Sequence, residues 1–125
     1  MLIEDMTLHL AVHYVETSAS LQTARAMMRN HHIGAVLVVD SDNSPTGILT
    51  SYDLLDVDDF TGTPITLRMS SELITVTPKD SVRHASELMV KHGCHHLVVT
   101  DGAEVTGIVS SLDIVNFYLQ AYTPA

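Results

Sequence analysis

Apolar residues recur at two different spacings along this chain of 125 residues. Within 21–32 and again within 82–92 they stand three or four positions apart, as on one face of an α-helix. Each segment precedes a short continuous run of apolar and β-branched residues, at 35–39 and 97–100. Such runs are typical of strands that are buried on both faces. The pattern therefore predicts a helix followed by a buried strand, and it predicts this unit twice.

Serines and glycines mark the expected ends of the helices. Ser20 and Ser81 stand directly before the helical segments, where a hydroxyl oxygen can accept a hydrogen bond from the first turn. Gly34 and Gly93 stand near the expected C-terminal ends. The remaining predicted elements are two turns at 40–45 and 101–103, two return strands at 47–50 and 105–110, and the beginnings of two closing helices at 52–55 and 112–119.

Two stretches of the chain are nearly the same. TGILTSYDLL at 46–55 and TGIVSSLDIV at 106–115 share five of their first nine residues. Upstream, residues 21–40 align with 82–101, so equivalent residues are 61 positions apart. After the turn between the two strands of each copy, this register becomes 60. The second copy therefore has one residue fewer between its strands, and a deletion of this kind belongs in a loop. The chain is a tandem duplication.

The duplication divides the chain into a first repeat with its linker, residues 1–60, and a second repeat, residues 61–125. A unit of about 60 residues with two strands buries little apolar surface by itself. We therefore expect the two repeats to pack together around one core.

Composition narrows the class of protein. Hydrophobic residues make up 46% of the chain, which is enough for a globular core. A net charge of −9 is unsuited to nucleic acid or to an anionic membrane, which attract basic patches. No apolar run approaches the roughly 20 residues of a membrane span, and the acidic N-terminal stretch lacks the basic region of a signal peptide. The single cysteine, Cys94, cannot form an intramolecular disulfide. We expect a cytoplasmic protein that binds neither nucleic acid nor membranes.

The order of these motifs, and their occurrence twice, resemble the pattern of the CBS domain. The tandem pair resembles a Bateman module. The likeness covers roughly residues 4–120. The residues that carry it are Ala24 and Met28, Ala85 and Met89, Val76-Thr77-Pro78, Asp40, Asp101 and the stretches at 46–55 and 106–115. The resemblance implies an α/β fold of the α+β type: two CBS repeats, each a small sheet with flanking helices, packed pseudo-symmetrically into one module.

The resemblance also implies a regulatory module that binds an adenosine-containing ligand, such as AMP, ADP, ATP or S-adenosylmethionine, in clefts between the repeats. In the family the aspartate of the Thr/Ser-x-x-Asp motif binds the ribose hydroxyls, and the hydroxyl residue lies beside the ribose-phosphate. The corresponding pairs here are Thr50 with Asp53, and Ser110 with Asp113. The further expected ligand-binding residues are His95 and His96 near a phosphate, Ile48 and Ile108 at the adenine, and Thr17 and Thr77 from the first strand of each repeat.

The spacing of the Thr/Ser-x-x-Asp motif has two physical interpretations. A carboxylate can accept hydrogen bonds from both hydroxyls of a ribose, and a helix N-terminus can bind a phosphate. The same residues can instead cap the closing helix, with the hydroxyl at the N-cap and the acid in the first turn. The spacing does not separate ligand binding from capping.

Charge restricts the ligand. Many nucleotide-binding members of the family have an arginine between the hydroxyl and the aspartate, whereas here those positions are Ser51-Tyr52 and Ser111-Leu112. With a net charge of −9 the chain compensates a triphosphate poorly. We therefore favour a monophosphate, or a neutral or cationic adenosyl ligand, over ATP. The second repeat, with His95-His96 where the first has Gly34-Ala35, is the better equipped for a phosphate.

No other motif predicts chemistry. The densest group of histidines, His92 with His95 and His96, lacks the further ligands of a metal site. No sequence motif pairs a nucleophile with a base, so we expect no enzyme, no metal and no required cofactor. We expect a stand-alone sensor that forms a homodimer and signals to an unknown effector protein in trans. The alternative is a dimerisation or protein-interaction module whose ligand clefts are empty or vestigial.

Overall fold

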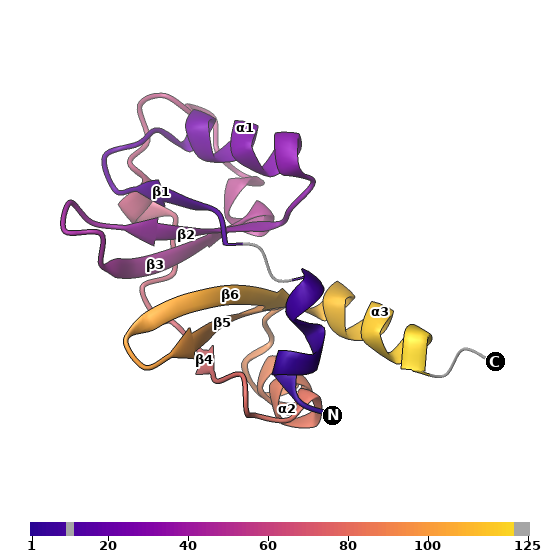
Figure 1. Cartoon of the computed structure of the whole chain (residues 1–125). Coiled ribbons are helices and arrows are strands. Elements are labelled where there is room, and N and C mark those ends of the chain that lie inside the picture. The colour runs from indigo at the N-terminus through magenta and orange to yellow at the C-terminus, as the bar shows by residue number, and fades with distance from the viewer. Residues whose placement is uncertain (10–11, 122–125) are drawn as a thin grey trace. The chain divides into compact units, whose positions relative to one another are not determined.

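The computed structural model describes residues 1–9 and 12–121, the side chains of residues 7–9 excepted. Its elements form two similar series (Figure 1). Writing η for a 3-10 helix, they are η1 (Ile3–His9), β1 (Tyr14–Glu16), α1 (Leu21–His31), β2 (Ala35–Val39), β3 (Pro45–Thr50), η2 (Ser51–Leu54), η3 (Ile65–Leu67), β4 (Thr75–Val76), α2 (Val82–His92), β5 (His96–Asp101), β6 (Glu104–Ser110) and α3 (Ser111–Ala121). The expected mixed α/β fold, with a small sheet in each repeat, is confirmed.

The two sheets have the same topology. Their strand orders are β1-β2-β3 and β4-β5-β6, with a parallel first pair and an antiparallel second pair in each. Val15 pairs with Val38 in the first sheet, and Val76 pairs with Val99 in the second. Both residues of the second pair lie 61 positions after those of the first, so the register read from the sequence also relates the two sheets.

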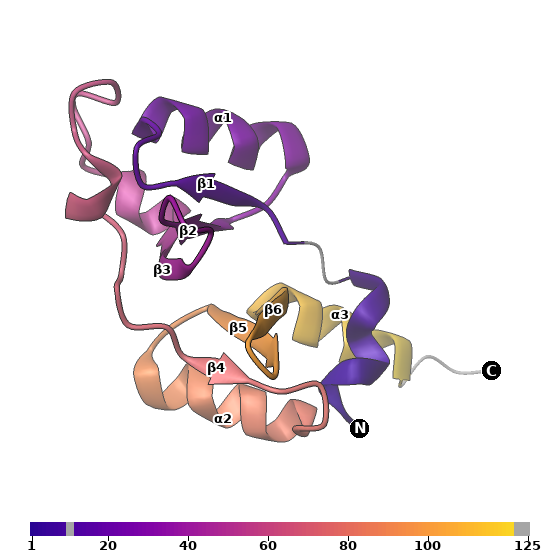
Figure 2. The same ribbon diagram turned by 60° about the vertical axis from the view of Figure 1, so that its left-hand side comes forward.

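The described chain forms two compact units, which we name by the repeat that each contains: the first-repeat unit, His13–Leu73, and the second-repeat unit, Met1–Val12 with Ile74–Ala125. The first residues of the chain thus pack with the second repeat. The backbone N–H of Ile3 donates to the carbonyl of Asp80 at 2.9 Å, and that of Val82 donates to the carbonyl of Met1 at 3.0 Å. Figures 1 and 2 both show η1 beside α3 in this unit.

Each unit has its own hydrophobic core. The second-repeat core contains Ile3, Met6, Val76, Val82, Ala85, Met89, Leu97, Val99, Val109 and Ile114. The first-repeat core contains Val15, Leu21, Ala24, Met28, Val36, Val38, Leu49 and Ile65. The expectation of one core was wrong, because segments outside the duplicated motif complete each cluster: η1 supplies Ile3 and Met6 to one, and η3 supplies Ile65 to the other.

The predicted helix starts are confirmed. The Ser20 hydroxyl accepts the N–H of Thr23 at 3.1 Å, and the Ser81 hydroxyl accepts that of His84 at 2.9 Å. The helices end near Gly34 and Gly93, as expected, but only Gly93 is itself the capping residue. The left-handed residue that ends α1 is His32, with φ of 53°, whereas in the second repeat the equivalent position is Gly93, with φ of 63°.

The first closing helix also differs from the prediction. After β3 the chain makes only the short turn η2, whereas α3 continues for 11 residues after β6. In α3, Phe117 and Tyr118 pack against the second-repeat core. The equivalent residues of the first repeat are Val57 and Asp58, within an acidic run. A helix continued through that run would present charge to the core, which is unfavourable.

Candidate functional site

The expected ligand residues of the second repeat gather at one end and on one face of its sheet. Ile108 and Ser110 alternate with Val109 along β6, and Val109 belongs to the core beneath the helices. Because successive side chains of a strand point to opposite faces, Ile108 and Ser110 lie on the other face. Ser110 is paired across the sheet with His96 of β5. Together with His95 and Asp113 these residues form what we call the second half-site.

The first repeat repeats this arrangement with different residues. Ile48 and Thr50 of β3 lie on the face opposite Leu49, which belongs to the first-repeat core. Thr50 is paired with Ala35, the position that His96 occupies in the second repeat. Ile48, Thr50 and Asp53 form what we call the first half-site. It has the same hydroxyl and carboxylate as the second half-site but no histidine.

The hydroxyl and carboxylate of each half-site are hydrogen-bonded within one turn. In the second, Asp113 Oδ2 accepts the backbone N–H of Ser110 at 2.8 Å, and Ser110 Oγ accepts that of Asp113 at 3.1 Å. In the first, Asp53 Oδ2 accepts the N–H of Thr50 at 2.8 Å and its hydroxyl at 3.2 Å. The carboxylates therefore hold the turns that follow β3 and β6, as the capping interpretation predicts.

Capping occupies only part of each carboxylate. All the hydrogen bonds that Asp53 and Asp113 accept within the described residues reach Oδ2, which leaves Oδ1 as an acceptor on a half-buried side chain. The bond through Oδ2 fixes the direction of the carboxylate, so a ligand hydroxyl would meet a group that is already oriented. Capping and ligand binding are thus compatible at these two positions.

The backbone brings His95 to the start of α3. The N–H of Ser111 donates to the carbonyl of His95 at 2.9 Å, and in the first repeat the N–H of Ser51 donates to the carbonyl of Gly34 at the same distance. The imidazole Nδ1 of His95 lies 3.4 Å from Ser111 Oγ. At the end of β6 an imidazole therefore stands beside the Ser111 hydroxyl, whereas in the first repeat Gly34 places no side chain beside the equivalent Ser51.

His96 is half-buried on β5. Burial lowers the pKa of this imidazole, the neighbouring His95 lowers it further, and the negative charge of Asp113 opposes both. His96 is therefore held mainly in its neutral form near pH 7. An anion bound beside it would favour the protonated form instead.

The glycine of the repeated Thr-Gly-Ile stretch has a packing role in the first repeat. Ile48 and Ser70 exchange two backbone hydrogen bonds, each of 2.9 Å, next to Gly47. A Cβ atom at Gly47 would lie 2.7 Å from the carbonyl oxygen of Ser70. The absence of a side chain thus allows the segment at Ser70 to approach β3, and this contact helps to bury Ile48.

Thr17 and Thr77 do not occupy equivalent places. Thr77 directly follows Val76, and its N–H donates to Asp80 Oδ2 at 2.8 Å. The residue that directly follows Val15 is Glu16, whereas Thr17 lies one position further, with its N–H donating to the carbonyl of Val39. Sequence reasoning did not consider Glu16. The 61-residue register of the upstream segments would have identified Glu16 as the residue equivalent to Thr77.

The described part of the chain contains neither a metal-binding cluster nor a membrane-spanning helix. Residues 1–9 and 12–121 contain no group of three or more histidine, cysteine, aspartate or glutamate side chains placed to hold a metal ion. Across the same residues, no helix has both the length and the apolar character needed to cross a membrane.

Two sheets of the same topology, each followed by a hydroxyl–carboxylate turn, define a protein built from two α/β repeats. The family model of the CBS domain matches residues 3–59 and 64–120. The chain belongs to the CBS-domain family and contains two CBS domains in tandem.

Known relatives include proteins of similar and of much greater length. CBS domain-containing protein YhcV of Bacillus subtilis is 31% identical over 115 residues, covering 89% of this chain and 80% of that protein. Uncharacterized protein MJ1404 of Methanocaldococcus jannaschii is 30% identical over 120 residues, which are 82% of this chain but 28% of that protein. An inosine-5'-monophosphate dehydrogenase of Nitrosopumilus maritimus is 31% identical over 105 residues, covering 82% of this chain and 21% of the enzyme.

Solved structures show the same fold. A protein with CBS domains from Burkholderia ambifaria superimposes with a TM-score of 0.91 at 24% identity, covering 100% of this chain and 98% of that one. The CBS domain pair of protein MJ0100, solved in complex with 5'-methylthioadenosine and S-adenosylmethionine, superimposes with a TM-score of 0.85 at 25% identity. That match covers 97% of this chain and 98% of the MJ0100 chain.

Proposed function

We propose that this CBS-domain pair is a regulatory module that binds an adenosine-containing ligand and signals to a partner protein. The observation that carries the proposal is the pair of oriented carboxylates, Asp53 and Asp113, each at the end of the last strand of its sheet and each with one oxygen free of hydrogen bonds from described residues. Such an oxygen can accept from a ribose hydroxyl. The binding of two adenosyl compounds by the MJ0100 domain pair supports this assignment.

The two half-sites differ in the ligand groups that they suit. His95 and His96 give the second half-site two groups that can become cationic, whereas the first half-site has none. The chain as a whole carries a net charge of −9. We infer a ligand of low negative charge, with AMP or S-adenosylmethionine favoured over ATP, and with any phosphate placed at the second half-site. Ile48, Ile108, Thr17 and Thr77 remain the proposed further contacts.

The test separates ligand binding from capping. In Asp113→Asn the amide oxygen can still accept the N–H of Ser110, so the turn is kept, but the side chain loses its charge and one of its two acceptor oxygens. Asp5→Asn is a matched control, because Asp5 Oδ2 accepts the N–H of Leu2 at 2.9 Å over the same three-residue spacing and lies outside both half-sites. Thermal unfolding is measured with AMP, ADP, ATP and S-adenosylmethionine.

We expect one of these compounds to raise the melting temperature of the wild type. At about 100 times its dissociation constant a ligand stabilises by about 2.7 kcal/mol. The shift should be retained in Asp5→Asn and reduced in Asp113→Asn, where losing a charged hydrogen bond costs about 1.5–3 kcal/mol of affinity. A ligand shift of equal size in all three proteins would remove Asp113 from the binding site.

A second function is favoured by one feature of the first half-site, which has Gly34 and Ala35 where the second has His95 and His96. If none of the four compounds changes the melting temperature, the chain is better described as a dimerisation or protein-interaction module with vestigial ligand sites. In both cases we propose that it acts as a homodimer and that its effector is a separate protein. Co-purification of a partner through a tagged chain, with and without the ligand, tests the signalling step.

A further inference from the structure

Two imidazole rings are stacked where the chain enters the first-repeat unit. His13 is the first residue of this unit and directly precedes β1, and His31 is the last residue of α1. Their ring centroids lie 4.1 Å apart, with 29° between the ring planes. Figures 1 and 2 both place the last turn of α1 on the same side of the unit as the start of β1. The stack therefore joins the end of the helix to the start of the first strand.

The backbone of His13 is also bound to the sheet. Its carbonyl oxygen accepts the N–H of Leu37 of β2 at 2.9 Å, and the parallel pairing of β1 with β2 begins at the next residue, Tyr14. Strand β1 has three residues and lies at the edge of its sheet, so few hydrogen bonds can hold it. The stacked rings support this short strand at the end where the chain enters.

The second repeat makes the same entry with a different side chain. The residues 61 positions after His13 and His31 are Ile74 and His92. The backbone contact is kept, because the N–H of Val98 donates to the carbonyl of Ile74 at 3.0 Å. The Ile74 side chain packs against the second-repeat core. The two repeats thus share the hydrogen bond at the strand entry and differ in its support, which is apolar packing in one and a pair of imidazoles in the other.

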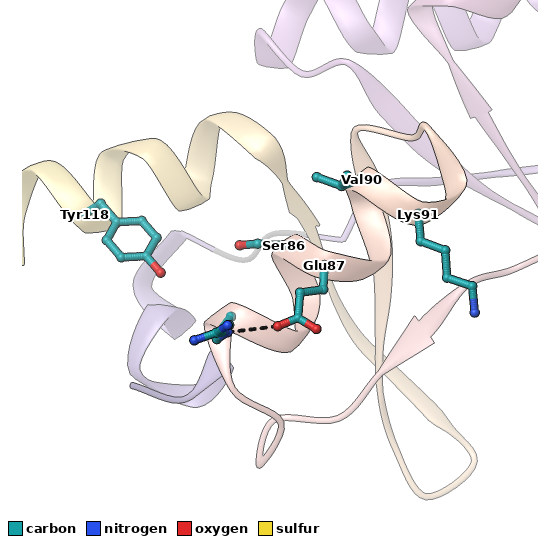
Figure 3. A pocket seen from close by; sticks show the side chains of 6 residues that line it. Ser86, Glu87, Val90, Lys91 and Tyr118 are labelled. Carbon is teal, nitrogen blue, oxygen red and sulfur yellow. Dashed lines mark hydrogen bonds and ion pairs between the residues drawn. The ribbon is translucent and has the colours of Figure 1, made fainter.

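Helix α1 has basic residues and no carboxylate. Its basic residues are Arg25, Arg29 and His31, and His32 follows directly. Helix α2 differs, because Arg83 donates to Glu87 in an ion pair of 2.9 Å (Figure 3). The position of α1 equivalent to Glu87 is Ala26. No acidic side chain of α1 can therefore compensate a proton on His31.

The neighbouring elements add little compensation. The titratable residues of β1 and of η2, which contacts α1, are Tyr14, Glu16, Tyr52 and Asp53, and β2 has none. Asp53 is already hydrogen-bonded to the N–H of Thr50. Within residues 1–9 and 12–121, no carboxylate forms an ion pair with either imidazole of the stack.

One proton and two protons therefore have different effects on the stack. The free carbonyl groups at the C-terminal end of a helix attract one cation. A second proton would place two positive charges about 4 Å apart, where their repulsion changes an equilibrium about five-fold even in bulk water. Separation of the rings relieves this repulsion.

We propose that the His13–His31 stack is a proton-sensitive anchor, which holds the start of β1 near neutral pH and releases it at mildly acidic pH. Histidine is the side chain whose charge normally changes between about pH 5 and pH 8. Protons can reach both rings, since His31 is exposed and His13 is half-buried. The anchor gives the domain pair a response to pH that does not depend on either half-site or on a bound ligand.

The experiment is amide hydrogen exchange of the ligand-free full chain, followed by NMR at pH 8 and at about pH 5.8. The N–H of Leu37 reports on the anchor, because its acceptor is the carbonyl of His13. Its protection factor, corrected for the intrinsic exchange rate, should fall about three- to six-fold at the lower pH. The lower value corresponds to repulsion in bulk water, and the upper value to a stack that excludes the second proton. The N–H of Ile48, which donates to Ser70 at the other edge of the sheet, should keep its protection.

Three variants identify the groups responsible. His13→Ile introduces the residue of the second repeat, and His31→Gln removes the other titratable ring. Each should abolish the fall in Leu37 protection, and their combination should have no further effect, because the repulsion needs both charges. His32→Gln is the matched control: it removes an adjacent exposed histidine outside the stack and should leave the fall unchanged. Circular dichroism should show that all the variants are folded.

Several results would overturn the inference: equal Leu37 protection at both pH values in the wild type, a fall that persists in His13→Ile or His31→Gln, or a fall that His32→Gln also removes. An equal fall at Ile48 would reject it too, because the whole unit would then be opening rather than the start of β1. Since no ligand is present, failure of the anchor leaves the proposed ligand binding untouched, and a domain pair that binds no adenosyl compound can still show the anchor.

Discussion

Replacing His32 by glycine should stabilise the protein. His32 ends α1 with φ of 53° and ψ of 45°, a left-handed conformation that costs an L-residue about 1–2 kcal/mol. The side chain is exposed, so its removal sacrifices little packing. Glycine is also freer in the unfolded chain, which offsets about 0.4–1 kcal/mol of the gain. The balance is a stabilisation of about 0.5–1 kcal/mol.

The assay is urea unfolding followed by circular dichroism, since the chain contains no tryptophan for fluorescence. Histidine cations at a helix C-terminus contribute about 0.3–1 kcal/mol, so the comparison is made at pH 8, where model imidazoles are neutral. His32→Ala is the matched control: it removes the imidazole but keeps the Cβ atom that causes the strain. We expect His32→Gly to raise the free energy of unfolding above that of both the wild type and His32→Ala.

The second repeat supplies the reverse test. Gly93 has φ of 63°, and a Cβ atom built on it would meet nothing within 4 Å. The cost of Gly93→Ala is therefore a backbone cost alone, expected to be about 1 kcal/mol. If Gly93→Ala is neutral, or if His32→Ala stabilises as much as His32→Gly, the left-handed strain is not the controlling quantity and the reasoning is refuted.

Gly47, His95 and His96 can be tested by substitution. Gly47→Ala should lower the free energy of unfolding by about 1–3 kcal/mol, because its Cβ would lie 2.7 Å from the Ser70 carbonyl oxygen; unfolding in urea measures this. Folding lowers the pKa of His96, so below about pH 6.5 the unfolded chain binds protons more readily than the folded chain. The free energy of unfolding should therefore fall as the pH falls through that value. In His96→Gln this fall should be smaller, which unfolding measured at several pH values would show. If the second half-site binds phosphate, calorimetry should show tighter AMP binding at pH 6 than at pH 8, and a variant with both His95 and His96 changed to glutamine should lose this dependence.

Much of the fold could be predicted because its signals are local. The helices α1 and α2 follow from apolar spacing and from a serine at each start, and the strands follow from their β-branched runs. Because the sequence is duplicated, each element was predicted twice, and agreement between the two copies supported predictions that rest on weak local signals. The two hydroxyl–carboxylate turns could be predicted as well, because the hydroxyl and the carboxylate of each pair lie three residues apart in a short motif that occurs twice.

What could not be predicted depends on contacts between distant residues. Nothing in the first twelve residues indicates that Ile3 and Met6 complete the core of the second repeat. The equivalence of Glu16 and Thr77 agrees with the 61-residue register, but β1 and β4 are too short for a pattern of their own that would have extended the alignment to them. The brevity of η2 depends on which side chains would reach the core, as the contrast between Asp58 and Tyr118 shows.

The Thr/Ser-x-x-Asp motif illustrates why sequence alone leaves function open. Its spacing predicts an N-terminal cap and a ribose-binding carboxylate equally well, and the structure shows the cap at both Thr50–Asp53 and Ser110–Asp113. A cap uses one carboxylate oxygen, whereas binding a diol needs an oxygen that remains free and points in a fixed direction. The cap itself supplies that fixed direction. If only capping mattered, asparagine could replace the aspartate, because its amide oxygen can still accept the N–H of the N-cap residue. The proposed function requires the charge, and the Asp113→Asn variant therefore distinguishes the two roles.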